Sequence, residues 1–278
     1  HLSLRRQRQM CIRDRSKIDE FRNEISNEIK YGLKLAFDED EIIADLQTEL
    51  SDVYKSYEFE KVDSVDKSRE MRFIDAISDG LEHAMKKHDD LVIMGQDIAE
   101  YGGVFKITDG FFEKFGKDRV RNTPICESGI IETAMGLSIA GIKSIVELQF
   151  ADFISSGFNP VVNYLAKSYY RWGQEADIVL RMPCGAGVGA GPFHSQTNEA
   201  WFTKTPGLKV LYPAFPYDAK GLLISAIQDP NPILFFEHKA LYRSQRQEVP
   251  VDCYSIPIGK AAMLKRGEDV TIITYGAG

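Results

Sequence analysis

Residues 144–181 read SIVELQFADFISSGFNPVVNYLAKSYYRWGQEADIVLR, and this stretch decides the fold. Apolar residues dominate 144–148 and 178–181, which predicts two short buried strands. Between them, residues 158–170 are predicted to form a helix. A strand, a helix and a second strand in this order predict a parallel pair of strands joined by a crossover helix.

The same alternation extends in both directions from this stretch. Other short apolar runs predict strands, and other segments with helical spacing predict helices. The strands are expected at 91–94, 208–211 and 233–236, and the helices at 74–85, 129–140 and 218–227. We therefore predict an α/β fold over residues 71–250, with a doubly wound, mostly parallel sheet flanked by helices. In such folds ligands bind where strands end and helices begin.

The segments on either side are expected to be separate parts. Residues 1–15 are basic without a clear period, so we expect a non-native or disordered leader. Residues 16–56 begin with apolar residues at helical spacing and are expected to form a helical tail, followed by a linker at 57–70. Residues 251–278 contain two more strand-like runs and are expected to be the truncated start of a second α/β domain. These runs are residues 261–265 and 270–275.

The composition excludes several classes of protein. The net charge of the 278 residues is −7, which argues against nucleic-acid binding, because phosphate affinity depends on clustered Lys and Arg. No apolar run reaches the roughly 20 residues that span a bilayer, so no membrane partner is expected. The 4 cysteines form no CxxC motif, so they predict reduced thiols in a cytoplasmic protein, not a zinc site or a disulfide framework.

Two loops place carboxylates next to predicted strand or helix ends. In TPICESGI, residues 123–130, Glu127 lies at the start of a helix, where the helix dipole stabilises its charge. It could therefore be a helix-terminal charge or a catalytic carboxylate. In VELQFADF, residues 146–153, Glu147 and Gln149 could satisfy the backbone of the loop or line a cofactor pocket.

The glycine-rich stretch CGAGVGAGPFHSQTNEAW, residues 184–201, contains His194. Its glycines allow close approach of a ligand, but they match neither a dinucleotide fingerprint nor a Walker loop. No GxSxG elbow supports a hydrolase. A lone histidine is more often structural than catalytic, but a loop between strands favours a functional role. The residues alone therefore predict an α/β enzyme-like domain whose site is built from loops.

Several motifs together resemble the β subunit of the decarboxylating component of 2-oxo acid dehydrogenase complexes. They occur in the family's order over about residues 71–278. They are GQDIAEYGGVFKITDG, TPICESGI, VELQFADF, GAGPFHSQTNEAW, TPGLKVLYPAFPYDAKGLL, DPNPILFFEHKALYR and GKAAMLKRGEDVTIITYGAG. Residues 16–56 resemble the C-terminal tail of the α subunit of the same component, which suggests a fragment of a fused α–β chain.

The resemblance implies the thiamine-diphosphate-binding fold, here as its pyrimidine domain. It also implies oxidative decarboxylation of a 2-oxo acid, with transfer of the acyl group to lipoamide. Glu127 matches the glutamate that contacts N1′ of the aminopyrimidine, and His194 matches a histidine that handles protons near the thiazolium. Ile125, Gln149 and Phe153 match residues that contact the aminopyrimidine.

The resemblance also implies two metal ions. In the family, magnesium and the diphosphate are held by a GDG…N motif of the α subunit. This sequence lacks that motif, so the chain by itself is expected to be inactive. Some members bind a structural potassium ion with oxygen ligands, although the segment DPNP is also typical of a helix-to-strand turn. The matching positions are Ala176, Ile178, Val179, Ala226, Asp229 and Asn231.

The implied partners are the α part of the component, a second β copy in a heterotetramer, the lipoyl-bearing acyltransferase core and a 2-oxo acid. Phe193 and the run FADF favour a branched-chain acid over pyruvate, although much of the substrate pocket belongs to the α subunit. Residues 129–140 and 164–172 are candidate contact surfaces. Two alternatives stay open: a transketolase-like or deoxyxylulose-phosphate-synthase-like enzyme, and a non-catalytic assembly module.

Overall fold

The computed structural model describes residues 2–65 and 67–278, and contacts divide the chain into two units, residues 1–46 and 47–278. The first unit contains helix α1 (Leu2–Phe37). Its predicted start at Ser16 was wrong, because residues 2–15 contain no Gly or Pro and a formed helix extends readily into such sequence. No helix in the described part of the chain has both the length and the hydropathy that crossing a membrane requires.

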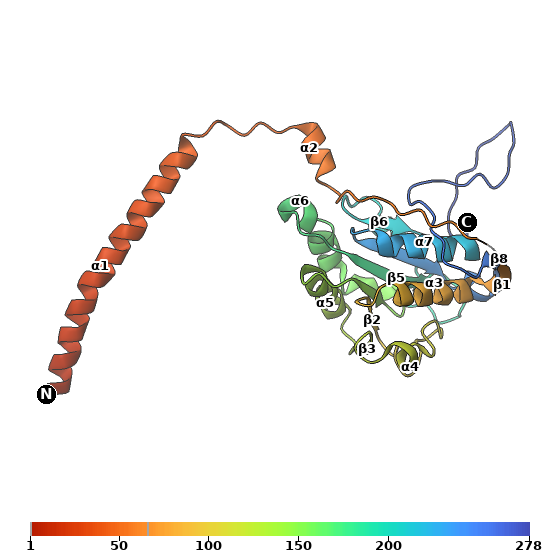
Figure 1. The fold of residues 1–278 in the computed structure, drawn as a ribbon, viewed down its shortest axis with the longest axis horizontal. Coiled ribbons are helices and arrows are strands. Elements are labelled where there is room, and N and C mark those ends of the chain that lie inside the picture. The colour runs from red at the N-terminus through yellow and green to blue at the C-terminus, as the bar shows by residue number, and fades with distance from the viewer. Residues whose placement is uncertain (1, 66) are drawn as a thin grey trace. The chain divides into compact units, whose positions relative to one another are not determined.

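The second unit is built on a six-stranded sheet in which every neighbouring pair is parallel (Figure 1). Its order is β3-β2-β4-β5-β7-β6. The strands are β2 (Val92–Gly95), β3 (Val120–Asn122), β4 (Ser144–Glu147), β5 (Ile178–Cys184), β6 (Lys209–Leu211) and β7 (Ile233–His238). The chain passes from β2 to β3 on one side and then returns to β4 on the other, so the winding reverses between β2 and β4. The predicted doubly wound sheet is confirmed.

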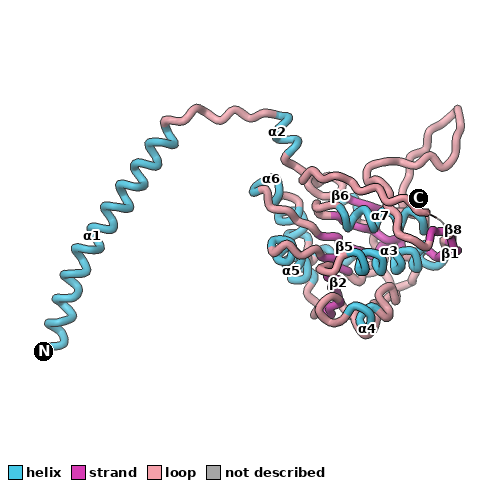
Figure 2. Tube along the Cα trace, viewed as in Figure 1, coloured by secondary structure: helices cyan, strands magenta, loops and turns pink. Residues whose placement is uncertain are grey.

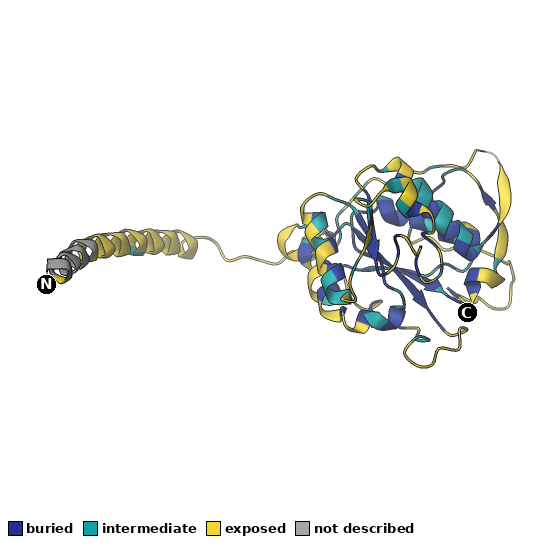
Figure 3. Ribbon diagram, turned by 90° about the horizontal axis from the view of Figure 1, so that it is seen from below, coloured by how far each residue is buried: buried dark blue, intermediate teal, exposed yellow. Residues whose placement is uncertain are grey.

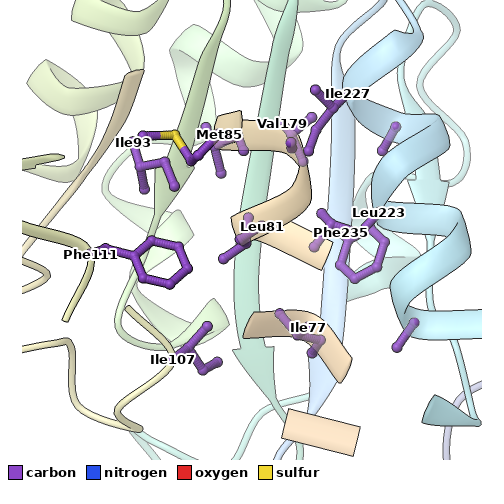
Figure 4. Packing of buried hydrophobic residues seen from close by; sticks show 14 of the residues in the cluster. Ile77, Leu81, Met85, Ile93, Ile107, Phe111, Val179, Leu223, Ile227 and Phe235 are labelled. Carbon is purple, nitrogen blue, oxygen red and sulfur yellow. The ribbon is translucent and has the colours of Figure 1, made fainter. Parts of the chain in front are cut away.

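Helices cover both faces of this sheet. On one face lie α3 (Phe73–Lys87) and α7 (Pro216–Gln228), which contact each other, and α5 (Glu127–Ile139) packs on the opposite face. Successive side chains of a strand point to opposite faces, and here Ile93 joins the α3–α7 core while Met94 joins the α5 core. Figure 4 shows the first of these cores, and Figure 3 shows burial concentrated in the strands. Two covered faces explain why the central strands β4, β5 and β7 are almost entirely buried.

Smaller elements complete the unit, and Figure 2 shows the loops that join them. Strands β1 (Ser68–Arg72) and β8 (Arg246–Pro250) form an antiparallel pair that the sequence analysis missed. The short helices are α2 (Leu46–Ser51), α4 (Phe111–Phe115), α6 (Ser168–Trp172) and α8 (Leu241–Ser244), with 3-10 turns η1 (Ala151–Ser155) and η3 (Glu199–Trp201) and a π-helical turn η2 (Pro160–Leu165).

Three predicted elements, one helix and two strands, were wrong. The single helix expected at 158–170 is divided into η2 and α6, because Lys167 (φ −120°, ψ −10°) leaves the helical conformation. The strands expected at 261–265 and 270–275 are loops with exposed apolar side chains such as Ile273. A strand needs a neighbour to pair its backbone groups, and the described residues provide none there.

The predicted linker at 57–70 belongs to the second unit and is held there by hydrogen bonds to residues near its C-terminal end. The Val62 N–H donates to Ser255 Oγ at 2.8 Å, and the Ser255 N–H donates to the Val62 carbonyl at 2.9 Å. Tyr54 further donates to the Leu208 carbonyl at 3.2 Å. The compact part of the chain thus begins at Gln47, ahead of the domain start that we predicted at residue 71.

Candidate active site

The predicted site residues lie in loops that follow strands at one edge of the parallel sheet. Strands of a parallel sheet end at the same edge, and ligands bind where the winding reverses. That reversal falls between β2 and β4. The loop after β2 carries Gln96 and Asp97, the loop after β3 carries Ile125 and Glu127, the loop after β4 carries Gln149 and Phe153, and the loop after β5 carries His194.

Glu127 is the first residue of α5 and is half-buried. Its Oε1 accepts a hydrogen bond from Gln96 Nε2 at 3.3 Å, and its Oε2 lies 3.2 Å from the Ser156 hydroxyl. These partners follow β2 and β4, so the carboxylate bridges two loops across the reversal point. This geometry favours a functional carboxylate over a charge that serves only its own helix. Both partners are neutral, so the carboxylate has no counter-ion among its hydrogen-bond partners.

Gln149 takes part in a second bridge between the same loops. Its Nε2 donates to Asp97 Oδ2 at 3.2 Å. Asp97 has a φ of 57°, in the left-handed region that a non-glycine residue rarely occupies. Because Gln96 and Asp97 are consecutive, one short turn after β2 contacts both Glu127 and Gln149. The sequence analysis missed both turn residues, although the motif GQDI directly follows a predicted strand.

The imidazole of His194 packs against two phenylalanines of the loop after β4. Its ring centroid lies 4.7 Å from that of Phe150 and 5.4 Å from that of Phe153, both nearly perpendicular. The Ser156 hydroxyl, 3.2 Å from Glu127, also lies 2.9 Å from the Phe153 carbonyl oxygen. Glu127 is therefore linked to His194 through two intervening residues, Ser156 and Phe153. Phe150 is a further residue that sequence reasoning missed.

The loop that carries His194 is closed at its base. The Gly185 N–H donates to the Gln196 carbonyl at 2.8 Å. Gly185 has a φ of 79°, and a Cβ at this position would lie 2.2 Å from Nε2 of His238. This turn therefore requires glycine. His194 Nδ1 is buried without a hydrogen-bond partner among the described residues.

Ile125 is 84% exposed, two residues before Glu127. Its aliphatic side chain forms neither hydrogen bonds nor aromatic ring contacts, so these contacts do not test its predicted role in cofactor binding. This exposed isoleucine is an apolar surface close in sequence to the Glu127 carboxylate. The structure therefore places all five residues predicted for catalysis and cofactor binding in loops at one edge of the sheet.

Glu147 has a different role from Gln149, its neighbour in the same motif. It is fully buried and accepts from Arg181 Nη1 at 2.6 Å. Arg181 also donates through Nε and Nη2 to the carboxylate of Glu237, at 2.7 and 2.9 Å, and Tyr242 donates to Glu237 at 2.6 Å. This network ties β4, β5 and β7 together beneath the site. The Glu147 carboxylate is therefore engaged inside the protein.

Two of the positions predicted for potassium, Asp229 and Asn231, contact each other, and their side chains are engaged internally. Asp229 accepts from the Lys209 ammonium through Oδ2 and from the backbone and side-chain nitrogens of Asn231 through Oδ1. Asn231 Oδ1 accepts from the Lys55 N–H at 2.8 Å. In this geometry the two side chains do not fit a potassium ion, because nitrogen donors already occupy their oxygens. The potassium ligand set stays a prediction.

Two cavities lie beside α5 and are not lined by Glu127 or His194. One, of about 300 Å³, is polar and is lined by Ser138, Glu175 and Asp177 among others. The other, of about 370 Å³, is apolar and includes Met135, Tyr164 and Trp172. The second cavity falls on the two segments that we predicted as contact surfaces.

Comparisons with known proteins agree with this geometry. A family model described as "Transketolase, pyrimidine binding domain" matches residues 69–245. The chain is 45% identical over 208 residues to the 2-oxoisovalerate dehydrogenase subunit beta of Bacillus subtilis (strain 168), covering 74% of this chain and 64% of that relative. It is 44% identical over 220 residues to the mitochondrial 2-oxoisovalerate dehydrogenase subunit beta of Dictyostelium discoideum, covering 78% and 59%.

A further relative and a solved structure extend the comparison. The chain is 43% identical over 210 residues to the pyruvate dehydrogenase E1 component subunit beta of Staphylococcus epidermidis (strain ATCC 12228 / FDA PCI 1200), covering 75% of this chain and 65% of the relative. A solved structure titled "Split gene transketolase, inactive beta4 tetramer" shares the fold, with a TM-score of 0.60, 21% identity and coverage of 74% and 63%.

These relatives are similar in sequence to this chain and agree with the resemblance to β subunits of 2-oxo acid dehydrogenases. The chain spans 59–65% of their length. The family model covers the sheet, both faces of helices and all the loops of the site. The chain therefore belongs to the family of transketolase pyrimidine-binding domains.

Proposed function

We propose that this chain is the pyrimidine-binding part of a thiamine-diphosphate-dependent 2-oxo acid dehydrogenase. The observation that carries the proposal is the Glu127 carboxylate, held between neutral donors from two loops where the winding of the sheet reverses. Identities of 43–45% to dehydrogenase β subunits support it as well. The bonds between Glu127 and neighbouring loops give no support to a purely structural role for this carboxylate in an assembly module.

The residues present fit the aminopyrimidine ring of thiamine diphosphate. Glu127 would hold the ring nitrogen N1′ and share a proton with it, Gln149 would donate to or accept from the ring substituents, and Ile125 and Phe153 would pack on the ring faces. When bound, this cofactor supplies the electron sink for decarboxylation. The task of Glu127 is to hold a proton at one fixed atom, which its two neutral hydrogen-bond partners allow.

We assign His194 to proton handling during acyl transfer to a lipoyl group. The buried, unpartnered Nδ1 and the two flanking phenylalanine rings leave the imidazole oriented by packing. A ring that is held without a strong hydrogen bond stays free to exchange protons with a substrate. Magnesium and the diphosphate would be held by the α part, which is a partner in this proposal.

A branched-chain 2-oxo acid is the proposed substrate. Phe193, which is 72% exposed beside His194, would supply apolar surface for the side chain of the acid. Two of the relatives are named for 2-oxoisovalerate and one for pyruvate. The difference between such acids is worth only about 1–3 kcal/mol per methylene in an apolar pocket, so the preference is expected to be graded.

The proposed assembly contains the α part, a second β copy and a lipoyl-bearing acyltransferase core. Exposed Tyr164 and Trp172 border the apolar cavity beside α5 and would cover it in an interface with the second copy. A potassium ion near Asp229 would have to be held by backbone carbonyls. A melting temperature that is higher in KCl than in NaCl would support that ion.

The test is a decarboxylation assay of the holoenzyme that contains this chain, with thiamine diphosphate, magnesium and an artificial electron acceptor. Substrates are 3-methyl-2-oxobutanoate and pyruvate. Glu127→Gln should abolish most of the activity, whereas Glu132→Gln, an exposed carboxylate on the same helix, should leave it intact. Full activity of Glu127→Gln would overturn the assignment of this residue. Inactivity of the wild type on both acids would overturn the reaction.

A further inference from the structure

The backbone of the loop that carries His194 is fastened by one carboxylate oxygen. Asp152 lies in η1, is 5% exposed, and accepts the backbone N–H groups of both Ser195 and Gln196 through Oδ1, each at 3.1 Å. Asn198 adds a bond in the other direction, because its Nδ2 donates to the Ala151 carbonyl at 2.8 Å. The segment after β4 therefore holds the loop after β5 in place, through hydrogen bonds to the two residues that directly follow His194.

The same segment supplies the packing surface of the imidazole. Phe150 and Phe153 flank Asp152 in sequence, and their rings contact His194. A movement of the backbone at Ser195 would therefore slide the imidazole across both rings. One acceptor, Asp152 Oδ1, serves two consecutive backbone N–H groups, so removing it would release both of them.

A buried cation lies next to this tether. Lys239 is 5% exposed, its ammonium lies 5.2 Å from the centroid of the Phe150 ring, and it has no hydrogen-bond partner among the described residues. Burial lowers the pKa of Lys239, and the charges of Cys184 and Asp152 oppose that change. The second oxygen of Asp152 is also buried and unpartnered. The Asp152 carboxylate therefore offsets only part of the effect of burial on the Lys239 ammonium.

We propose that Asp152 is a positioning residue for His194: it fixes the backbone at Ser195 and Gln196 so that the imidazole stays against Phe150 and Phe153. The proposal rests on the role of His194 in the proposed function. It adds a residue that does not touch the reacting atoms and acts through the loop. Neither the glycine-rich motif nor the contacts of Glu127 and Gln149 by themselves require an acidic residue at position 152.

The experiment compares Asp152→Ala, Asp152→Asn and His194→Ala in the holoenzyme. An asparagine oxygen can still accept both N–H groups, whereas alanine cannot. Two activities are measured: reductive acylation of a lipoyl domain, and decarboxylation with an artificial acceptor. We expect Asp152→Ala to lower kcat for acylation by about 100-fold, with KM for the 2-oxo acid changed by less than about threefold. Asp152→Asn should restore most of that loss.

Hydrogen exchange gives a readout that does not depend on activity. The amides of Ser195 and Gln196 should exchange faster in Asp152→Ala than in Asp152→Asn. Ser155→Ala, which removes a hydroxyl 3.1 Å from the Asp152 carbonyl, is the matched control and should change neither exchange nor activity. Should Asp152→Ala fail to fold, the asparagine variant still tests the proposal, because its activity and exchange must stay close to those of the wild type.

The outcomes separate the two claims. A loss of acylation in His194→Ala but not in a folded Asp152→Ala would overturn the role of Asp152 and leave the proposed function standing. Full acylation in His194→Ala would overturn the role of His194, and the positioning proposal would fall with it. Equal losses in Asp152→Asn and Asp152→Ala would also overturn the proposal, since they would show that the two accepted hydrogen bonds do not set the position of the loop.

Discussion

Glu127 and Glu147 lie in adjacent parts of one sheet edge but differ in what surrounds them. Glu127 is half-buried, and its hydrogen-bond partners among the described residues are the neutral side chains of Gln96 and Ser156. Glu147 is fully buried and forms an ion pair with Arg181, which also binds Glu237. A carboxylate with neutral partners can still bind a ligand or a proton, whereas one that pairs with a buried guanidinium is committed to the fold. Partner charge and burial thus separate a candidate catalytic group from a structural one.

The largest expected effect is the loss of activity when Glu127 is replaced. Glu127→Gln should lower kcat of the holoenzyme by about 10²–10⁴-fold, because a positioned proton carrier is lost. The free energy of unfolding should change by less than about 0.5 kcal/mol, because the amide keeps the size and hydrogen bonding of the side chain. Steady-state kinetics and urea titration of the same samples measure both. A large loss of stability in Glu127→Gln would mean that Glu127, like Glu147, has a structural role.

The next largest effect is a loss of stability when the buried network around Glu147 is broken. Arg181→Met should lower the free energy of unfolding by about 3–5 kcal/mol, because two buried carboxylates lose their counter-ion. Urea unfolding followed by circular dichroism measures it. Arg121→Met is the control, since Arg121 is exposed and forms an ion pair with exposed Asp118 at 3.7 Å. Its cost should stay below about 1 kcal/mol. Equal costs in the two variants would contradict the structural role of the network.

A smaller effect should follow from removing a neutral partner of Glu127. Gln96→Leu deletes the donor to Oε1, and we expect kcat to fall by up to about tenfold, in line with the loss of one hydrogen bond. Gln247→Leu, which removes an exposed amide whose Oε1 accepts from the Tyr217 N–H at 3.1 Å, is the control and should have no effect on kcat. Kinetics that are unchanged in Gln96→Leu would mean that Ser156 alone holds the carboxylate.

The smallest effect concerns the pH dependence of stability. It involves His238, which lies beside Gly185 at the base of the loop that carries His194. Burial, followed by the charge of Lys239, lowers the pKa of His238 in the folded protein. The unfolded chain therefore binds the proton first as pH falls, and stability should decrease below about pH 6.5. His238→Gln should flatten that slope in urea titrations between about pH 5 and 7. An unchanged slope would mean that other groups, such as His88, whose pKa is also lowered by burial, account for it.

The prediction of the fold succeeded where hydrophobic pattern alone decides the structure. Strands β2, β4, β5, β6 and β7 were located because each is a short apolar run between helices. Strands β1 and β8 were missed because they are half-exposed and polar, as in SREMR, and form only when residues far apart in sequence meet. The strands expected after residue 260 failed for the converse reason: the residue pattern is present, but no neighbour supplies hydrogen bonds.

For the site, the residues themselves and the resemblance of their motifs pointed to Glu127 and His194. The sequence could not reveal Gln96, Phe150 or Asp152, because nothing about their spacing shows that they meet residues some 30–45 positions away. Without the resemblance, the residue pattern alone could not separate Glu127 from Glu147, since both are carboxylates at the end of a predicted element.

The sequence by itself therefore determined five of the six strands of the parallel sheet and the edge at which a site would form. These depend on local pattern and on the fact that parallel strands end together. Only the tertiary structure decided which carboxylate remains available, which is locked in an ion pair, and which holds the histidine loop. That choice depends on burial and on the charge of partners brought from distant parts of the chain, and no local pattern encodes either one.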